Sequence, residues 1–276
     1  MSEQFYENTN VVESIEKDGI KIEIIEYKSL KGSKDQNLAE NLFYIQNAGM
    51  SLKQVKITLD NSGLLTETGT LHFHKGNITA ESKTGGVGGL AKKIVKNKLT
   101  NESIFKPQYK GTGEIFLEPS FGHFIIVELD DESIVVDKDL FYCCEETLKV
   151  GVESQKNLSS GLFGNEGWFQ TKITGSGLCV LEIPVPMSEV LKCELNNEKL
   201  QVDGNFAFLR SASISYSVQR STKNLVGALT SGEGMLQTFE GTGRVWIAPT
   251  HTIYGSLIGN GFGALAAPTR NRTNDM

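Results

Sequence analysis

His72 and His74 form a His-x-His pair, and their spacing is the first in the chain that could serve chemistry. On a β-strand, side chains two residues apart point to the same face, so both imidazoles could reach one metal ion. A cupin-type site would add a glutamate four or five residues after the second histidine, where this chain has Ile78 and Thr79. The pair is therefore only a weak metal candidate, and no metal or other cofactor is expected.

The remaining candidates for catalysis stand alone. His123 and His251 each follow a predicted strand and are interpreted as turn residues. We interpret the acidic pairs Asp130-Asp131 and Glu145-Glu146 as a turn and a solvated strand end rather than as an acid and base. No Gly-x-Ser-x-Gly elbow, phosphate-binding P-loop or His-Glu-x-x-His sequence occurs. The sequence favours a protein that is not an enzyme.

Three loops carry a different kind of signal, because each mixes glycine with large apolar residues. They are Gly85–Leu99, Asn157–Phe163 and Asn224–Leu229, and the first contains a predicted short basic amphipathic helix over Leu90–Lys98. Such a surface could dock another protein subunit or an anionic membrane face. The alternative is that these residues plug the open end of the chain's own barrel. The candidate interaction residues are Leu90, Lys92, Lys93, Ile94, Lys96, Leu162, Phe163, Leu225 and Val226.

The elements that must position these residues recur along the chain. The segments Asn101–Gly113, Asn165–Gly177 and Gly232–Gly243 each contain an acidic residue, apolar residues, an alternating strand and Gly-Thr/Ser-Gly. Farther along, Val127–Tyr142 aligns with Cys193–Phe208 without a gap. Three ordered blocks in register predict three repeats of about 65 residues.

Turn chemistry accompanies each repeat. Asp60-Asn61, Asp130-Asp131 and Asn196-Asn197 lie between alternating runs and are predicted to close β-hairpins. The Gly-x-Gly sequences are predicted to bend the chain between repeats.

The predicted organisation is an N-terminal segment over residues 1–37 with one strand from Ile20, followed by a single repeat domain over residues 38–250. Its repeats run over about 38–110, 111–174 and 175–240, with a closing strand at 241–250. Residues 251–276 form a Gly- and Ala-rich tail with a flexible end.

Charge and cysteine content narrow the setting of the protein. A formal net charge of −6 disfavours nucleic acid as a partner, since nucleic-acid binders carry basic surfaces. No secretory signal or membrane-spanning apolar run is expected. None of the four cysteines belongs to a Cys-x-x-Cys pair, so we interpret them as reduced packing residues of a cytoplasmic protein: Cys143, Cys144, Cys179 and Cys193.

The motifs GGLAKKIVKNKLTNESIF, SSGLFGNEGWF, LTSGEGMLQTFEGTG and GTGRVWIAP occur in order between Leu42 and Pro249. This set resembles the altered-inheritance-of-mitochondria biogenesis family, which includes uncharacterised bacterial proteins. The resemblance implies an all-β fold: a double-stranded β-helix or barrel-like sandwich of three pseudo-threefold repeats, similar to the tryptophan RNA-binding attenuation protein (TRAP). It implies no catalytic motif, so no functional residue is carried over.

The leading hypothesis is a non-enzymatic scaffold or interaction protein that forms homo-oligomers and docks partners through the three loops. The alternative is a small-ligand or metal-binding protein, or an enzyme, with a pocket between repeats.

Overall fold

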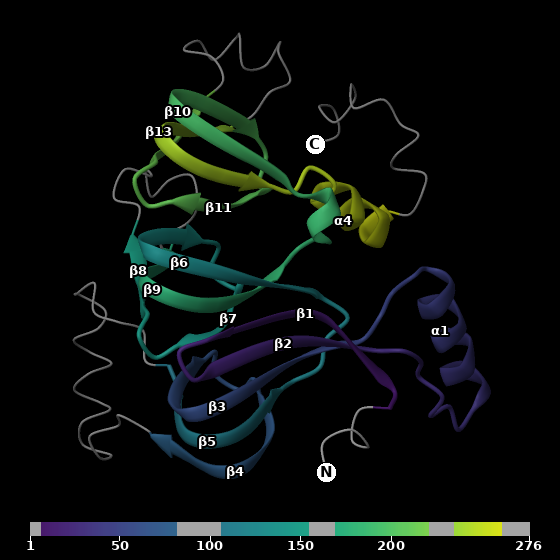
Figure 1. Ribbon diagram of the computed structural model, residues 1–276. Helices are drawn as coiled ribbons and strands as arrows, with labels where there is room; N and C mark the ends of the chain where they lie inside the picture. Colours follow the sequence, from purple (N-terminus) through teal and green to yellow (C-terminus); the bar gives the residue numbers. More distant parts are fainter. Residues whose placement is uncertain (1–6, 82–105, 155–168, 221–234, 261–276) are drawn as a thin grey trace, which may run out of the picture. The chain divides into compact units, whose positions relative to one another are not determined.

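The computed structural model of the chain describes residues 7–81, 106–154, 169–220 and 235–260 (Figure 1). Within these residues, thirteen strands belong to one hydrogen-bonded sheet, and the pairs described below are all antiparallel. The predicted all-β class is confirmed in this coarse form. The finer double-stranded, TRAP-like arrangement stays a prediction.

The chain divides into two compact units, each described by itself. The N-terminal unit comprises Met1–Asp131, Asp139–Gly151 and Thr174–Ile183, and the C-terminal unit comprises Glu132–Lys138, Val152–Ile173 and Pro184–Met276.

In the N-terminal unit, the central strand is β3 (Lys53–Thr66). Its first half pairs with β2 (Ile20–Tyr27), its last residues pair with β7 (Phe141–Glu145), and β5 (Gln108–Leu117) follows it along the other edge. The outer strands are β1 (Thr9–Lys17), on β2, and β4 (Leu71–Glu81), on β5. Three further strands contribute residues to both units: β6 (His123–Val136), β8 (Lys149–Ser154) and β9 (Phe169–Ile183). The end of β9 pairs with β7.

Alternation of β-branched residues explains the core of this unit. In β2, Ile20, Ile22 and Ile24 lie on one face and are at most 2% exposed. They pack with β-strand residues such as Val55 and Ile57 into one apolar cluster. Branched side chains favour such a half-buried pleated surface, so the sequence IKIEIIEY is a strong strand former.

In the C-terminal unit, β13 (Met235–Ile247) is the central strand. It pairs along one edge with β10 (Leu191–Asp203) and along the other with β11 (Ala207–Ser211) and β12 (Ser215–Arg220). A smaller apolar cluster fills this unit, built around Val245, Phe239 and Ile214. A short 3₁₀ turn, η2 (Met187–Glu189), and the helix α4 (His251–Asn260) complete it.

The predicted hairpin turns at Asp60-Asn61, Asp130-Asp131 and Asn196-Asn197 are wrong. Each dipeptide lies inside a long strand: β3, β6 or β10. In β3 the register jumps from Leu59 opposite Gly113 to Ser62 opposite Gly111, so two residues face one, which defines a β-bulge. The same jump separates Leu195 from Glu198 in β10.

The Gly-x-Gly sequences face these bulges rather than separating repeats. Asn61, Asp131 and Asn197 have φ of 50°, 50° and 55°. Each of their backbone N–H groups is accepted by the hydroxyl of the residue between two glycines on another strand, rather than by a backbone carbonyl. The three bonds are Asn61 N to Thr112 Oγ1 at 3.0 Å, Asp131 N to Ser176 Oγ at 2.9 Å and Asn197 N to Thr242 Oγ1 at 3.0 Å.

Three elements were not anticipated from the sequence. A strand, β1, precedes the predicted strand at Ile20, and a helix, α1 (Gln36–Asn47), lies between β2 and β3. The helix α4 forms at His251–Asn260, where only a Gly- and Ala-rich tail was predicted. The helix predicted over Leu90–Lys98 lies outside the described residues. The cysteines are free, as expected, with Cys143, Cys144 and Cys179 buried and Cys193 partly exposed.

Candidate functional site

The loop residues proposed from sequence all lie outside the described part of the chain. This applies to the nine candidates Leu90, Lys92, Lys93, Ile94, Lys96, Leu162, Phe163, Leu225 and Val226. The docking surface built on them therefore stays a prediction, and the described residues supply the sites considered below.

His72 is held by an amide rather than by a metal-binding group. Its Nδ1 lies 3.0 Å from Nε2 of Gln54, which also donates to the carbonyl oxygen of Leu117 at 2.8 Å. Since an amide nitrogen only donates, Nδ1 of His72 accepts and the ring proton lies on Nε2. His74 follows on the same strand and is exposed. The described residues contain no group of three His, Cys, Asp or Glu side chains placed to hold a metal ion.

The other two histidines begin regular elements instead of lying in turns. His123 is the first residue of β6, and His251 is the first residue of α4.

A cleft of about 350 Å³ opens in the N-terminal unit. It lies where the β1–β2 turn, the β3 bulge, the segment after β7 and the Gly-x-Gly of β9 meet. Its lining residues are Lys17, Asp18, Ile20, Asn61, Ser62, Gly63, Glu145, Glu146, Thr147, Ser176 and Gly177. They come from the predicted N-terminal segment and from all three predicted repeats, so only the fold brings them together.

Glu145 is buried in this cleft, which corrects the interpretation of Glu145-Glu146 as a solvated strand end. The residue is 7% exposed, and its Oε1 accepts the backbone N–H of Leu178 at 2.8 Å. Burial raises the pKa of the Glu145 carboxyl, and this hydrogen bond from Leu178 lowers it in part.

The role of Glu145 is to satisfy a backbone group that the Gly-x-Gly bend leaves unpaired. The C-terminal unit has the same arrangement, in which Ser211 Oγ accepts the N–H of Arg244 at 3.0 Å, one residue after Gly243. Comparing the repeats at this position could have identified Glu145 from sequence, because a short hydroxyl stands where the carboxylate does.

Glu146 is exposed to the cleft and doubly bound. It accepts from Gln108 Nε2 at 2.8 Å and pairs with Lys110 Nζ at 2.7 Å. Gly63 makes room for it, since a Cβ at Gly63 would lie 2.3 Å from the Glu146 carboxyl carbon. The cleft thus presents hydroxyls and carboxylates that could hold a small polar molecule.

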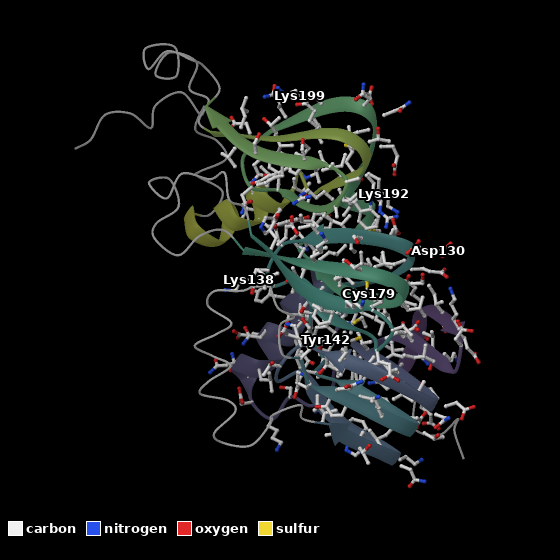
Figure 2. The ribbon with its side chains drawn as sticks, turned by 90° about the vertical axis from the view of Figure 1, so that its left-hand side faces the viewer. Asp130, Lys138, Tyr142, Cys179, Lys192 and Lys199 are labelled. Carbon is white, nitrogen blue, oxygen red and sulfur yellow. The ribbon has the colours of Figure 1, made fainter. Side chains whose placement is uncertain are left out.

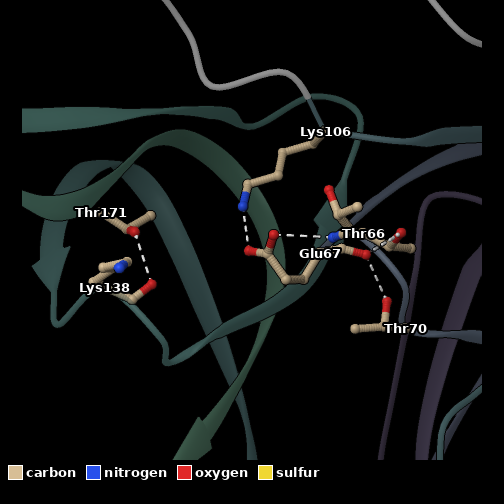
Figure 3. Close-up of polar contacts among 7 residues, drawn as sticks. Thr66, Glu67, Thr70, Lys106, Lys138 and Thr171 are labelled. Carbon is tan, nitrogen blue, oxygen red and sulfur yellow. Dashed lines mark hydrogen bonds and ion pairs between the residues drawn. The ribbon is translucent and has the colours of Figure 1, made fainter.

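A second polar cluster lies at the start of β5 in the N-terminal unit (Figure 3). Lys106 has a side chain only 6% exposed, pairs with the Glu67 carboxylate, and lies 5.0 Å from the centre of the Phe141 ring. The Glu67 carbonyl oxygen accepts from Thr70 Oγ1 at 2.8 Å. These contacts join residues of the N-terminal unit to one another and stabilise its fold.

Tyr142 adds another internal tie. Its side chain is buried within the N-terminal unit (Figure 2). Its hydroxyl donates to the carbonyl oxygen of Glu118 at 2.6 Å. Burial is the main cause that raises the pKa of the Tyr142 phenol.

The helix α1 carries large apolar side chains that face solvent. Asp35 caps its N-terminus by accepting the Leu38 N–H at 2.9 Å, yet no side chain of α1 is buried. Phe43 is 61% exposed and Tyr44 67% exposed, and Leu38 also faces solvent. Figure 1 shows α1 set apart from the strands of the N-terminal unit. No helix among the described residues combines the length and apolarity needed to cross a bilayer.

A family model described as mitochondrial biogenesis AIM24 matches residues 44–250. The chain belongs to this family. The resemblance read from the motifs between Leu42 and Pro249 is thereby confirmed. Most of α1 and both strands before it precede the residues that the family model matches.

Seven chains of solved structures also match. One is the crystal structure of a protein from Streptococcus pyogenes, at 20% sequence identity and a TM-score of 0.56. The match covers 76% of this chain and 94% of the streptococcal chain, and it shows that the two proteins share a fold. No curated protein matches the chain.

Proposed function

We propose that this family member is an interaction protein that self-associates, and that α1 is its contact element. The observation that carries the proposal is a formed, capped helix whose apolar side chains find no buried place on their own chain.

Helix length supports the need for a partner. α1 has 12 residues, and isolated helices of about 12–15 residues are marginal in water. Most helical stability in proteins comes from packing an apolar face, and α1 buries none. Packing against a partner would supply the missing stabilisation.

The charge of α1 favours a second copy of this chain as the partner. Glu40 is its one charged residue, and it lies near the N-terminus of the helix. An antiparallel pair of α1 helices would place the two Glu40 carboxylates at opposite ends and would oppose the two helix dipoles. An anionic membrane surface is disfavoured, because membrane-surface helices carry Lys and Arg on their polar face.

The area available indicates weak association. Aromatic side chains bury about 150–250 Å² each, so the exposed parts of Phe43 and Tyr44 together offer about 250 Å² per copy. Leu38 and Met50, 38% and 48% exposed, extend the patch. Two copies would still bury less than a standard interface of about 1,600 Å², so the oligomer should dissociate on dilution.

Sedimentation velocity over a wide concentration range tests this proposal. We expect the wild-type weight-average mass to rise with concentration and the variant Phe43→Glu/Tyr44→Glu to stay monomeric. The matched control is Asn41→Glu/Gln46→Glu, which adds the same charge at exposed polar positions of α1.

A wild-type protein that is monomeric at every concentration would refute self-association. An oligomer that both double variants form equally well would move the contact away from α1, and the three loops predicted from sequence would be tested next.

The cleft of the N-terminal unit supports a second candidate function, the binding of a small polar ligand. Its buried Glu145 and the hydroxyls of Ser62, Thr147 and Ser176 converge on one space. Native mass spectrometry of freshly purified protein should then show a stoichiometric added mass that Ser176→Ala reduces. An unchanged polypeptide mass would leave self-association as the favoured function.

The scaffold role and the cytoplasmic location belong to the same proposal. Four free thiols, three of them buried, fit a reducing compartment.

A further inference from the structure

Arg210 places a positive charge inside the C-terminal unit. It lies on β11 and is 4% exposed. Its Nη1 donates to the carbonyl oxygen of Ile214 at 3.0 Å and, more weakly, to that of Ser211 at 3.5 Å. Its guanidinium carbon lies 5.7 Å from the centre of the Tyr216 ring. Burying a guanidinium is costly unless an anion or several acceptors compensate for lost water.

One whole edge of this guanidinium has no acceptor among the described residues. The buried Nε of Arg210 has no hydrogen-bond partner, and both of its hydrogen bonds leave from Nη1. The Nε–H and Nη2–H groups of arginine point the same way, and that edge binds planar carboxylates with two parallel hydrogen bonds.

Neighbouring carboxylates of the unit are engaged elsewhere. Glu153 is close enough for its charge to raise the pKa of Arg210, although burial lowers that pKa more. Its carboxylate pairs with Lys172 Nζ at 3.5 Å. Asp137 accepts from Gln170 Nε2 at 3.1 Å. Neither forms an ion pair with Arg210 in the described part of the chain.

A second unpartnered donor accompanies the arginine. The Tyr216 hydroxyl is buried and has no hydrogen-bond partner among the described residues. Burial, together with the charge of Asp137, raises the pKa of Tyr216 to about 12, so the phenol keeps its proton. A protonated phenol can donate to an anionic oxygen.

We propose that Arg210 and Tyr216 form a binding site for a small carboxylate, whose oxygens accept from Arg210 Nε–H and Nη2–H and from the Tyr216 hydroxyl. Nearby residues Ile214 and Phe239 belong to the apolar cluster of the unit, so an aliphatic group on the carboxylate would suit the surroundings. A water molecule could accept from one donor, but it would not neutralise the buried charge.

Arginine side-chain NMR tests the site directly. The chain has five arginines, so the ¹H–¹⁵N region of the Nε–H groups is sparse: Arg210, Arg220, Arg244, Arg270 and Arg272. Arg210→Lys identifies one cross-peak by its loss. We expect that peak to shift downfield and saturate on addition of sodium acetate or butyrate, against sodium chloride at equal ionic strength.

Two variants make the result specific. Tyr216→Phe should keep the Arg210 peak and weaken carboxylate binding by about 2–10-fold, the range that one lost hydrogen bond gives. Arg244→Lys should leave the Arg210 titration unchanged, since Arg244 pairs with Glu132 at 2.7 Å. Should Arg210→Lys fail to fold, elimination of the other arginine peaks by substitution assigns Arg210.

An Arg210 peak that responds to acetate no more than to chloride overturns the proposal. So does an equal response in Tyr216→Phe and wild type. Both outcomes are independent of α1 and of the oligomeric state.

Discussion

Gly111 faces the β3 bulge, and its replacement by alanine should unfold the N-terminal unit or nearly so. Its φ is +136°, and a Cβ there would lie 1.9 Å from the backbone carbonyl oxygen of Asn77 on the neighbouring strand β4. Two other glycines of the unit separate the causes. Gly69 has φ +82° but open space around a Cβ, and Gly32 has open space and no positive φ.

The expected costs differ by several kcal/mol. Gly32→Ala should be neutral or stabilise the fold by up to about 1 kcal/mol, through the entropy of the unfolded chain. Gly69→Ala should cost about 1–2 kcal/mol for the left-handed backbone. Gly111→Ala adds a backbone overlap that must separate β4 from β5 and break ladder hydrogen bonds, so about 4–6 kcal/mol is expected. Domain stabilities are about 5–15 kcal/mol, so this loss is large.

Urea unfolding followed by far-UV circular dichroism gives the midpoints, and hydrogen exchange of the β3, β4 and β5 amides localises the effect to this unit. We expect the order Gly32→Ala, Gly69→Ala, Gly111→Ala from most to least stable. A Gly111→Ala protein no less stable than Gly69→Ala would refute the argument that close strand approach at the bulge requires glycine there.

Three further predictions concern other buried groups. Burial raises the pKa of Glu145 in the folded protein, so protonation of this carboxyl stabilises the fold in acid, and the stabilisation is lost as pH rises through the folded pKa. Glu145→Gln should therefore be more stable than wild type at pH 7 and equally stable below about pH 4. Urea unfolding across pH measures this difference. Equal stability of the two proteins at all pH values would contradict this. Tyr142→Phe removes the hydrogen bond to the Glu118 carbonyl oxygen and should cost about 1 kcal/mol, with a lower thermal midpoint as the readout. Burial raises the pKa of the Cys143, Cys144 and Cys193 thiols, and Cys179 is buried as well. A disulfide reagent should therefore label native protein first at the partly exposed Cys193 and, only after unfolding, at Cys143, Cys144 and Cys179.

The sequence predicted the bulges as hairpin turns because both need the same residues. Asn61, Asp131 and Asn197 adopt positive φ, which Asn and Asp tolerate in either setting. What distinguishes a bulge from a turn is the Gly-x-Gly strand opposite it. That pairing joins residues far apart in the sequence, so local patterns do not contain it.

The helix α1 was missed for a different reason. Its sequence QNLAENLFYIQN has a capping Asp35 and apolar residues at helical spacing, which is the usual local signal. The repeat analysis instead placed residues from Leu38 onward in the first repeat. Arg210 was not singled out from the sequence either, because no sequence pattern marks an arginine as buried.

The bulge in β3 also sets the order in which this strand can form. Before the bulge, β3 pairs with β2, and only the segment that contains α1 separates the two strands in the sequence. The two ends of that segment are joined by a hydrogen bond from the Tyr27 N–H to the carbonyl oxygen of Leu52 at 2.9 Å. After the bulge, it pairs with β7, for which a much longer stretch of chain must close. Loop closure becomes entropically more costly with length, and pairings distant in sequence form slowly. The residues of β3 before Asn61 are therefore expected to pair early, with β2. The residues after Asn61 are expected to pair late, with β7.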